Sequence, residues 1–260
     1  MVDIKITRAS VLKEKPASST LVFGKSMTDH MFIVDYDEGQ GWHDPVIKPY
    51  GPLPLDPSAM CLHYGQEAFE GQKAFCGADG VIRIFRPEEN AKRMRSSAEY
   101  LKMALPPVDM FVDMMKRVVK ANERFVPPYG TGASLYIRPV LFGTGPQVGV
   151  KPAGEYLLIV FVTPVGPYYK EGFNPIKVLI DRDHDRAAPL GTGHVKAGGN
   201  YAASLTSAEI GHEKGYPSVL YLDAKEKKHI DECGAANFFG IRDGVYITPK
   251  SHSVLPSITN

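Results

Sequence analysis

The sequence predicts an α/β protein built from two domains, residues 1–165 and residues 176–260. Up to about residue 165, strand-like runs are interleaved with two amphipathic helical stretches. The segment from Gly166 to Pro175 combines glycine, proline and aromatic residues in a way typical of an interdomain linker. Beyond it a new series begins, with a strand, a glycine-rich stretch, a helix and several short strands. These observations place the domain boundary in residues 166–175.

The first domain opens with strands. Residues 1–60 read as short strands joined by Pro and Gly turns, most clearly at Met31-Phe32-Ile33-Val34. Two further runs, 72–76 and 81–85, are separated by Gly77-Ala78-Asp79-Gly80, a turn sequence typical of hairpins. We therefore expect a β-hairpin just before the first helix.

Two helices follow in the same domain. Pro87, Glu88 and Glu89 suit a first helical turn, where proline loses no hydrogen bond and acids favour the dipole. Apolar residues then recur at helical spacing as far as Pro106-Pro107, which predicts the end of this helix: Met94, Ala98, Leu101 and Leu105. A second helix is expected from near Asp109, with a core-facing side made of Phe111, Met114, Met115, Val118 and Phe125.

Strands complete the first domain and dominate the second. Residues 134–142 predict a strand, and the apolar run 155–163 predicts a strand buried on both faces. After the linker we expect a strand at 176–180, a helix from about 200 to 213, and a meander of strands at 218–222, 228–232, 236–241 and 245–248. Residues 257–259 look like the start of a further helix.

Composition argues against several functional classes. The chain has 260 residues, 43% of them hydrophobic, and its net charge of +1 argues against binding nucleic acid or membrane surfaces through bulk charge. No apolar run approaches the length of a membrane span. The three cysteines lack C-x-x-C spacing and the eight histidines are scattered, so neither a disulfide framework nor a metal site is expected. With no signal core at the N-terminus, we expect a cytoplasmic protein.

Three groups of residues point to chemistry. Lys196 sits among four glycines with Tyr201 five positions later, and glycine lets the backbone approach a ligand, so an imine to an aldehyde is the hypothesis. Glu232 lies in an apolar strand, where an unpaired carboxylate is costly, so it should face a cation or a protonated nitrogen. Tyr136 and Arg138 are two apart on a strand and could receive a carboxylate. Each group alone also fits a structural role, as a surface lysine, an ion pair or an exposed sheet face.

Five segments, taken in order, resemble the branched-chain aminotransferases, fold-type-IV enzymes that depend on pyridoxal 5'-phosphate (PLP). The order and spacing of the segments cover nearly the whole chain, and each alone is a weak signal. They are Leu62-His63-Tyr64-Gly65-Gln66-Glu67-Ala68-Phe69-Glu70-Gly71, Phe85-Arg86-Pro87 through Asn90 to Arg93-Met94, Tyr136-Ile137-Arg138-Pro139, Lys196-Ala197-Gly198-Gly199-Asn200-Tyr201 and Leu255-Pro256-Ser257-Ile258-Thr259.

The resemblance implies that PLP lies between the two domains and is held at its ring by three residues. Lys196 would bind it as an imine and later move a proton between the substrate and the cofactor. Tyr201 would hydrogen-bond the phenolic oxygen, and Glu232 would keep the pyridine nitrogen protonated.

The resemblance also assigns the phosphate end of the cofactor. Arg93 would bind the phosphate, assisted by the backbone N–H groups of Ile258 and Thr259 at the start of the expected helix.

Substrate recognition is implied for a second set of residues. Tyr64, Phe69 and Tyr168 resemble the apolar side-chain pocket, while Tyr136 and Arg138 resemble the groups that handle the substrate carboxylates. The implied reaction is amino transfer between leucine, isoleucine or valine and 2-oxoglutarate, giving glutamate.

The resemblance implies a homodimer as well. Val148 and Val150, on the loop after the strand at 134–142, resemble residues that reach into the pocket of the neighbouring subunit.

Other interpretations remain open. A D-amino-acid aminotransferase or an aminodeoxychorismate lyase shares the fold, although Tyr136-Ile137-Arg138-Pro139 and Phe69-Glu70-Gly71 favour the branched-chain member. In a different class, Lys196 could form an imine directly with a carbonyl substrate, as in an aldolase, which leaves Arg93 without a clear purpose. The family continues well past Leu255–Thr259, so we expect a C-terminally truncated chain with an incomplete second domain. A third alternative is therefore an inactive fragment that only associates with intact subunits.

Overall fold

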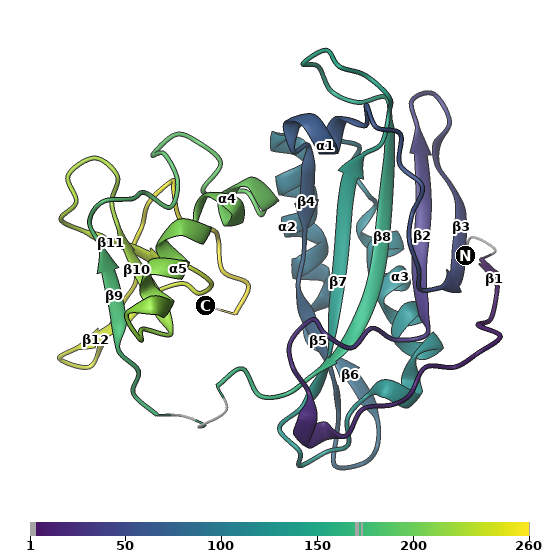
Figure 1. Cartoon of the computed structure of the whole chain (residues 1–260), viewed down its shortest axis with the longest axis horizontal. Helices are drawn as coiled ribbons and strands as arrows, with labels where there is room; N and C mark the ends of the chain where they lie inside the picture. The colour runs from purple at the N-terminus through teal and green to yellow at the C-terminus, as the bar shows by residue number, and fades with distance from the viewer. Residues whose placement is uncertain (1–3, 170–171, 173, 260) are drawn as a thin grey trace. The chain divides into compact units, whose positions relative to one another are not determined.

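The structure is a computed structural model that describes residues 4–169, 172 and 174–259. It divides into two compact units, residues 1–172 and residues 173–260, here called the N-terminal and C-terminal units (Figure 1). The division falls within the predicted linker 166–175, of which residues 170, 171 and 173 lie outside the described residues.

Eight strands of the N-terminal unit form one sheet in the order β1-β3-β2-β8-β7-β5-β6, with β4 paired to β7 (Figure 1). All neighbouring strands are antiparallel except β1 and β3. The strands are β1 (Lys5–Ile6), β2 (His30–Asp37), β3 (Gly41–Pro49), β4 (Glu67–Phe69), β5 (Gln72–Cys76), β6 (Ile82–Ile84), β7 (Ser134–Gly143) and β8 (Glu155–Val165). The predicted hairpin β5–β6 and the predicted central strands β7 and β8 are confirmed.

Two long helices, α2 (Pro87–Tyr100) and α3 (Val108–Ala121), pack against this sheet, α3 lying against β2, β7 and β8. The unit also contains α1 (Met60–Tyr64) and the 3-10 turns η1 (Ser18–Thr20) and η2 (Glu123–Phe125). The predicted apolar side of the second helix is confirmed as core, because all five side chains are at most 1% exposed: Phe111, Met114, Met115, Val118 and, within η2, Phe125.

The first helix ends earlier than the sequence predicts. It ends at Tyr100 rather than at Pro106-Pro107. Lys102 has a left-handed φ of 55°, and the Met103 N–H donates to the Ala98 carbonyl at 2.8 Å, so the chain leaves the helix through a Schellman-type turn. A lysine in the left-handed region gives no sequence signal, so the helical spacing of the following leucines is misleading.

Strand alternation separates the two faces of the sheet. On β7, Ile137 is fully buried in the core that α2 and α3 share, whereas Tyr136 and Arg138 point to the opposite face. The register places Lys73 of β5 directly opposite Tyr136. Phe69 of β4 shares this face, because the Arg138 guanidinium lies over its ring, 4.5 Å from the centroid. The face away from the two long helices thus collects the predicted carboxylate-binding pair.

In the C-terminal unit a three-stranded sheet has the order β11-β10-β9. Strands β9 (Val178–Asp181) and β10 (Ser218–Leu222) are parallel, and the crossover between them contains α4 (Gly198–Ala203) and α5 (Leu205–Glu213). Strand β11 (Ile230–Cys233) is antiparallel to β10. Strands β12 (Gly240–Arg242) and β13 (Val245–Ile247) form a separate hairpin.

Two predictions for this unit are wrong in detail. The single helix expected at 200–213 is broken at Ser204, whose hydroxyl donates to the Tyr201 carbonyl at 2.8 Å and so competes with the helical ladder. The expected meander is interrupted because the chain turns sharply after β11, with Glu232 bridged to Asn237 and the Cys233 N–H donating to the Ala236 carbonyl. The next strand consequently begins only at Gly240.

Candidate active site

Lys196 and Tyr201, predicted to act together, are in contact. Lys196 lies just before α4, and its Nζ donates to the Tyr201 Oη at 2.8 Å. The loop that carries Lys196 is closed by Asn200, whose side-chain amide donates to the carbonyls of Thr192 and Val195 at 2.7 and 2.8 Å. These bonds fix the course of the backbone, and the first turn of α4 then brings Tyr201 beside the lysine. The result is an amine held against a phenol.

Glu232 is buried on β11 and is fully engaged by polar partners. Its Oε1 is 2.6 Å from the Arg186 Nη2 and accepts from the Leu255 N–H at 3.1 Å, while Oε2 accepts from the Asn237 side-chain amide at 3.0 Å. A carboxylate has about four acceptor positions, so these contacts among the described residues leave one on Oε2. Burial raises the pKa of Glu232, and the Arg186 charge and the Leu255 N–H oppose that rise. The sequence argument for a cation beside Glu232 is met by Arg186.

Arg186 and Asn237 are partners that the sequence analysis did not identify. Arg186 lies in an ordinary-looking run, Arg186-Ala187-Ala188-Pro189, and no local pattern links it to Glu232. The only available signal was indirect, because a buried carboxylate demands a cation from somewhere in the chain.

The segment after Ser253 lies next to Glu232. Besides the Leu255 N–H contact, the Asn237 amide donates to the Leu255 carbonyl at 2.9 Å. Ile258 and Thr259, predicted as backbone donors to a phosphate, follow in this segment without forming a helical turn, and the Thr259 N–H donates to the Ser257 Oγ at 3.2 Å. The structure therefore connects this segment to the Glu232 carboxylate through Leu255.

In the N-terminal unit, Arg93 is held by a carboxylate that the sequence analysis did not assign a role. Its Nε lies 2.7 Å from Glu70 Oε1 and its Nη2 lies 3.0 Å from Glu70 Oε2. Glu70 has no exposed side-chain surface, and Asn90 donates to it at 2.7 Å. The bidentate pair fixes the plane of the guanidinium, a geometry suited to a residue that must present donors in one direction.

Tyr136 and Arg138 are neighbours, as their spacing predicts. Arg138 Nη2 donates to the Tyr136 Oη at 3.0 Å, and Arg138 Nε is buried without a hydrogen-bond partner among the described residues. A Cβ at Gly71 would lie 2.0 Å from the Tyr136 Oη, so the position of this phenol requires glycine there. Lys73, opposite Tyr136, is a further cation on this face, and burial lowers its pKa. Together they make a cationic and phenolic surface able to bind a carboxylate.

The remaining predicted substrate residues lie on the outside of the N-terminal unit. Tyr64 donates from its hydroxyl to the Val148 carbonyl, which ties α1 to the loop after β7. Val148 and Val150 are 67% and 81% exposed, and the Tyr168 ring packs edge-on against Tyr169 with centroids 4.8 Å apart. The structure thus brings Tyr64 and Val148 together and leaves the two valines accessible.

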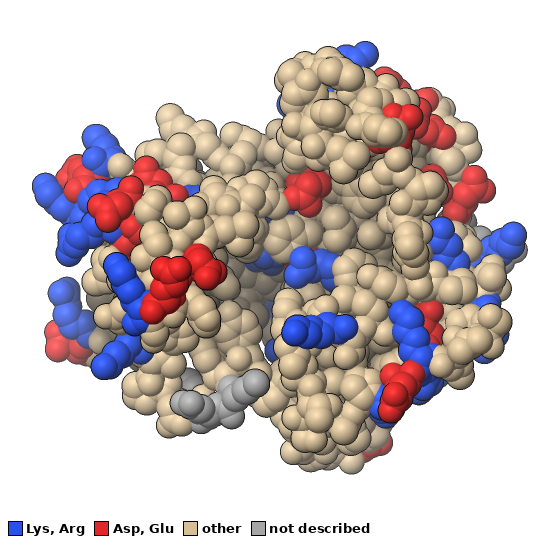
Figure 2. Space-filling model, viewed as in Figure 1, with Lys and Arg blue, Asp and Glu red and all other residues tan. Residues whose placement is uncertain are grey.

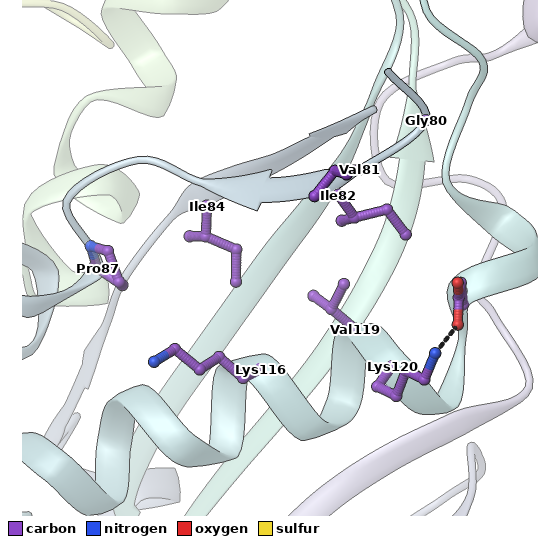
Figure 3. Close-up of a pocket in the computed structure, with 9 residues that line it drawn as sticks. Gly80, Val81, Ile82, Ile84, Pro87, Lys116, Val119 and Lys120 are labelled. Atoms are coloured by element: carbon purple, nitrogen blue, oxygen red, sulfur yellow. Dashed lines mark hydrogen bonds and ion pairs between the residues drawn. The ribbon is translucent and has the colours of Figure 1, made fainter. Parts of the chain in front are cut away.

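A cavity of about 500 Å³ lies elsewhere on the N-terminal unit (Figure 3). Apolar side chains of the β5–β6 hairpin face Lys116, Val119 and Lys120 of α3 across it. None of its lining residues belongs to the predicted site, and Lys120 is paired with Glu123. The cavity is therefore separate from the groups described above.

Charge and hydropathy give no sign of a single-sign or membrane-spanning surface. On the face shown in Figure 2, Lys and Arg are interspersed with Asp and Glu on both units. Within the described residues, no helix is long and apolar enough to cross a membrane. In the same part of the chain, no group of three or more His, Cys, Asp or Glu side chains is placed to hold a metal ion.

Comparison with known proteins identifies relatives over most of the chain. A branched-chain-amino-acid aminotransferase of Haemophilus influenzae is 47% identical over 247 residues, which is 93% of this chain and 71% of the relative. One of Mycolicibacterium smegmatis is 44% identical over 242 residues, which is 91% of this chain and 66% of the relative. This chain thus spans about two thirds to 70% of the length of these relatives.

The fold has a solved relative too, a branched-chain amino acid aminotransferase crystallised with pyridoxamine 5'-phosphate, its source given as T.th. It superposes with a TM-score of 0.69 and 27% identity, covering 87% of this chain and 70% of the solved chain. Residues 67–260, which include every strand of the C-terminal unit, match the family described as amino-transferase class IV. The chain belongs to the class IV aminotransferase family.

Proposed function

We propose that this chain catalyses reversible amino transfer between a branched-chain amino acid (leucine, isoleucine or valine) and 2-oxoglutarate, with PLP bound to Lys196. The two relatives from Haemophilus influenzae and Mycolicibacterium smegmatis carry the name branched-chain-amino-acid aminotransferase, and the solved relative was crystallised with pyridoxamine 5'-phosphate. The observation that carries the proposal is the 2.8 Å contact between Lys196 Nζ and Tyr201 Oη, inside the region that matches the family.

The donors and acceptors of the C-terminal unit fit this cofactor. An aldehyde needs an amine, a phenolic oxygen needs a donor, and a protonated pyridine nitrogen needs a carboxylate with an acceptor position left. Lys196, Tyr201 and the remaining position on Glu232 Oε2 meet these needs. Arg93, fixed by Glu70, and the N–H groups of Ile258 and Thr259 are the groups we assign to the phosphate.

The chemistry follows from these assignments. PLP, when bound, supplies an electron sink for the charge that develops at the substrate Cα. The Lys196 amine would move the proton at that carbon, which is general acid–base catalysis by a group held within reach. Tyr201 keeps Nζ in place through their hydrogen bond, and Glu232 would hold a proton at the pyridine nitrogen.

Substrate binding is assigned to the N-terminal unit. Tyr136 and Arg138 would bind the carboxylates, and Arg138 suits the distal carboxylate of glutamate because a guanidinium binds carboxylates in a bidentate manner. The rings of Tyr64, Phe69 and Tyr168 would bind the aliphatic side chain. Rejecting neither ligand requires a surface that is apolar and cationic in adjacent places, and Arg138 over the Phe69 ring provides both.

We also propose a homodimer in the cytoplasm. The exposed Val148 and Val150 are suited to contact a second copy, whose pocket they would help to line. The three cysteines are free thiols, which fits a reducing compartment. Sedimentation of the wild-type chain and of a Val148→Asp, Val150→Asp variant tests the dimer, which should be lost in the variant.

The cofactor assignment is tested by absorption spectroscopy. Purified chain is mixed with PLP and passed over a desalting column, and the visible band of lysine-bound PLP is recorded. We expect the band in the wild type and in Lys214→Ala, a control at an exposed lysine after α5, and no band in Lys196→Ala. A folded wild-type chain that retains no PLP would contradict the proposal.

The substrate assignment is tested on the same sample. Adding L-leucine should bleach the visible band, and 2-oxoglutarate should restore it, because the two half-reactions run in opposite directions. D-alanine should leave the band unchanged. Bleaching by D-alanine alone would replace the branched-chain assignment with a D-amino-acid aminotransferase.

A further inference from the structure

Arg186 connects three segments of the C-terminal unit. Its side chain is 9% exposed, and its Nη2 meets three acceptors: Glu232 Oε1 at 2.6 Å, the Gly193 carbonyl at 2.7 Å and the Ser253 carbonyl. One acceptor lies on β11, one on the loop before Lys196, and one on the segment that leads to Leu255. A single buried cation thus holds the three segments that carry the proposed cofactor groups.

We propose that Arg186 is a positioning residue for the cofactor centre: it keeps Glu232 ionised and fastens the Lys196 loop to the segment around Ser253. The inference rests on the proposed function for its catalytic meaning. Its structural content, the coupling of Arg186 to Glu232 and to two backbone carbonyls, can be tested without any cofactor.

The first part of the argument is electrostatic. Glu232 is buried, and a buried carboxylate without a cation takes up a proton. A protonated Glu232 could not act as the acceptor for a protonated pyridine nitrogen. The other charged or titratable groups near Glu232 are Lys196, Asp231 and the Cys233 thiol, and of these only Lys196 favours the ionised carboxylate. Arg186 is the cation in direct contact, so the ionised state depends chiefly on it.

The second part is steric. Gly193 lies three positions before Lys196, and a Cβ there would be 2.1 Å from the Ser253 carbonyl oxygen. The two backbones therefore pack directly against each other, and their two carbonyls face the same guanidinium nitrogen. Since carbonyls repel one another, this close approach needs a shared donor, which Arg186 provides.

The third part is energetic. Arg186 Nε is buried without a hydrogen-bond partner among the described residues. A buried ion pair with an unsatisfied donor is a poor way to gain stability, because desolvation offsets much of the attraction. A buried arginine in this position is better explained by the charge state and placement of Glu232.

The first experiment uses the chain without PLP. Hydrogen exchange of the β10 amides, corrected for intrinsic exchange rates, is measured between about pH 5 and pH 8, the range in which a raised carboxyl pKa acts. The variants are Arg186→Met, Arg186→Met with Glu232→Gln, and Arg182→Met, a control at an exposed arginine of the same segment.

In Arg186→Met the folded-state pKa of Glu232 lies above its unfolded value, so the folded state binds more protons and protection should fall as pH rises. Adding Glu232→Gln should remove that slope, and Arg182→Met should match the wild type. A wild-type slope in Arg186→Met would overturn the proposal. If Arg186→Met does not fold, Arg186→Lys answers instead: a Lys at 186 should keep the wild-type slope, and a steep slope would overturn the charge argument.

The second experiment adds PLP. Arg186→Met should retain PLP about 10-fold more weakly, comparable to the loss of outer-shell partners at metal sites. Its visible band should also titrate at a different pH from that of the wild type. Unchanged affinity and titration would overturn the positioning role while the proposed function stood. Failure of the wild-type chain to bind PLP would instead refute the proposed function, and the cofactor-free experiment would still decide the Arg186–Glu232 coupling.

Discussion

At the scale of single residues, the two glycines on either side of Lys196 have opposite requirements. A Cβ at Gly193 meets the Ser253 carbonyl at 2.1 Å, whereas at Gly199, in α4, nothing lies within 4 Å. We expect Gly193→Ala to destabilise the C-terminal unit by about 1–3 kcal/mol, the usual cost of overpacking. Gly199→Ala should be neutral or stabilising by up to about 1 kcal/mol, because alanine is the better helix former.

Hydrogen exchange of the β10 amides in the two variants measures this difference. The single tryptophan, Trp42, lies on β3 of the other unit and would not report it. Equal protection in the two variants would mean that the loop can move away from Ser253, against the packing described above.

Lys73 allows a prediction about charge. Burial on the face opposite the long helices lowers its pKa below the usual lysine value. The unfolded chain therefore binds more protons than the folded chain in the window below about pH 10.4, roughly the free lysine pKa, and stability rises with pH there. Lys73→Met should remove this dependence and raise the melting temperature of the N-terminal unit at neutral pH. Thermal unfolding followed by Trp42 fluorescence checks it, and a lowered melting temperature at neutral pH would contradict it.

The sequence predicts single residues well where the partners are close along the chain. Lys196 and Tyr201 are five apart, and Tyr136 and Arg138 are two apart on one strand, so local geometry brings each pair together. The Arg186–Glu232 pair and the Arg93–Glu70 pair join residues far apart in sequence. Such pairs depend on the tertiary fold, which periodicity does not encode.

At the scale of elements, the Glu70–Arg93 pair joins the end of β4 to α2. Glu70 follows β4 directly and is fully buried, and it also accepts from Asn90 one turn earlier in the helix. Glu70→Ala would leave a buried guanidinium without its carboxylate, which typically costs about 3–5 kcal/mol.

Urea unfolding followed by Trp42 fluorescence measures this cost. Glu89→Ala is the matched control, because the Glu89–Lys92 pair on the same helix is exposed and should have no measurable effect on the midpoint. Equal midpoints for the two variants would show that Arg93 finds another partner.

Elements were predicted best where their apolar pattern is long. The paired strands β7 and β8 and the apolar side of α3 follow directly from the sequence. The errors lie at ends and breaks: the left-handed Lys102 after α2, the Ser204 break between α4 and α5, and the turn after β11. Each is set by one backbone conformation or one side-chain hydrogen bond, which hydrophobic periodicity cannot reveal.

At the scale of the whole molecule, burial is distributed unequally between the two units. Within the described residues, both hydrophobic core clusters belong to the N-terminal unit. The β12–β13 hairpin of the C-terminal unit instead exposes large apolar side chains, namely Phe239, Ile241, Val245, Tyr246 and Ile247. Because the free energy of local opening follows buried apolar contact, the two units should differ in stability.

Hydrogen exchange over the whole chain tests this inequality. Amides of β2, β7 and β8 should exchange slowest, those of β9–β11 faster, and those of β12–β13 fastest. PLP should then slow exchange around Lys196 and Glu232, because a ligand that binds only the folded state stabilises it by mass action. Slow exchange of β12–β13 in the unliganded chain would contradict the first expectation. Protection by PLP that spared the residues around Lys196 and Glu232 would place the cofactor elsewhere.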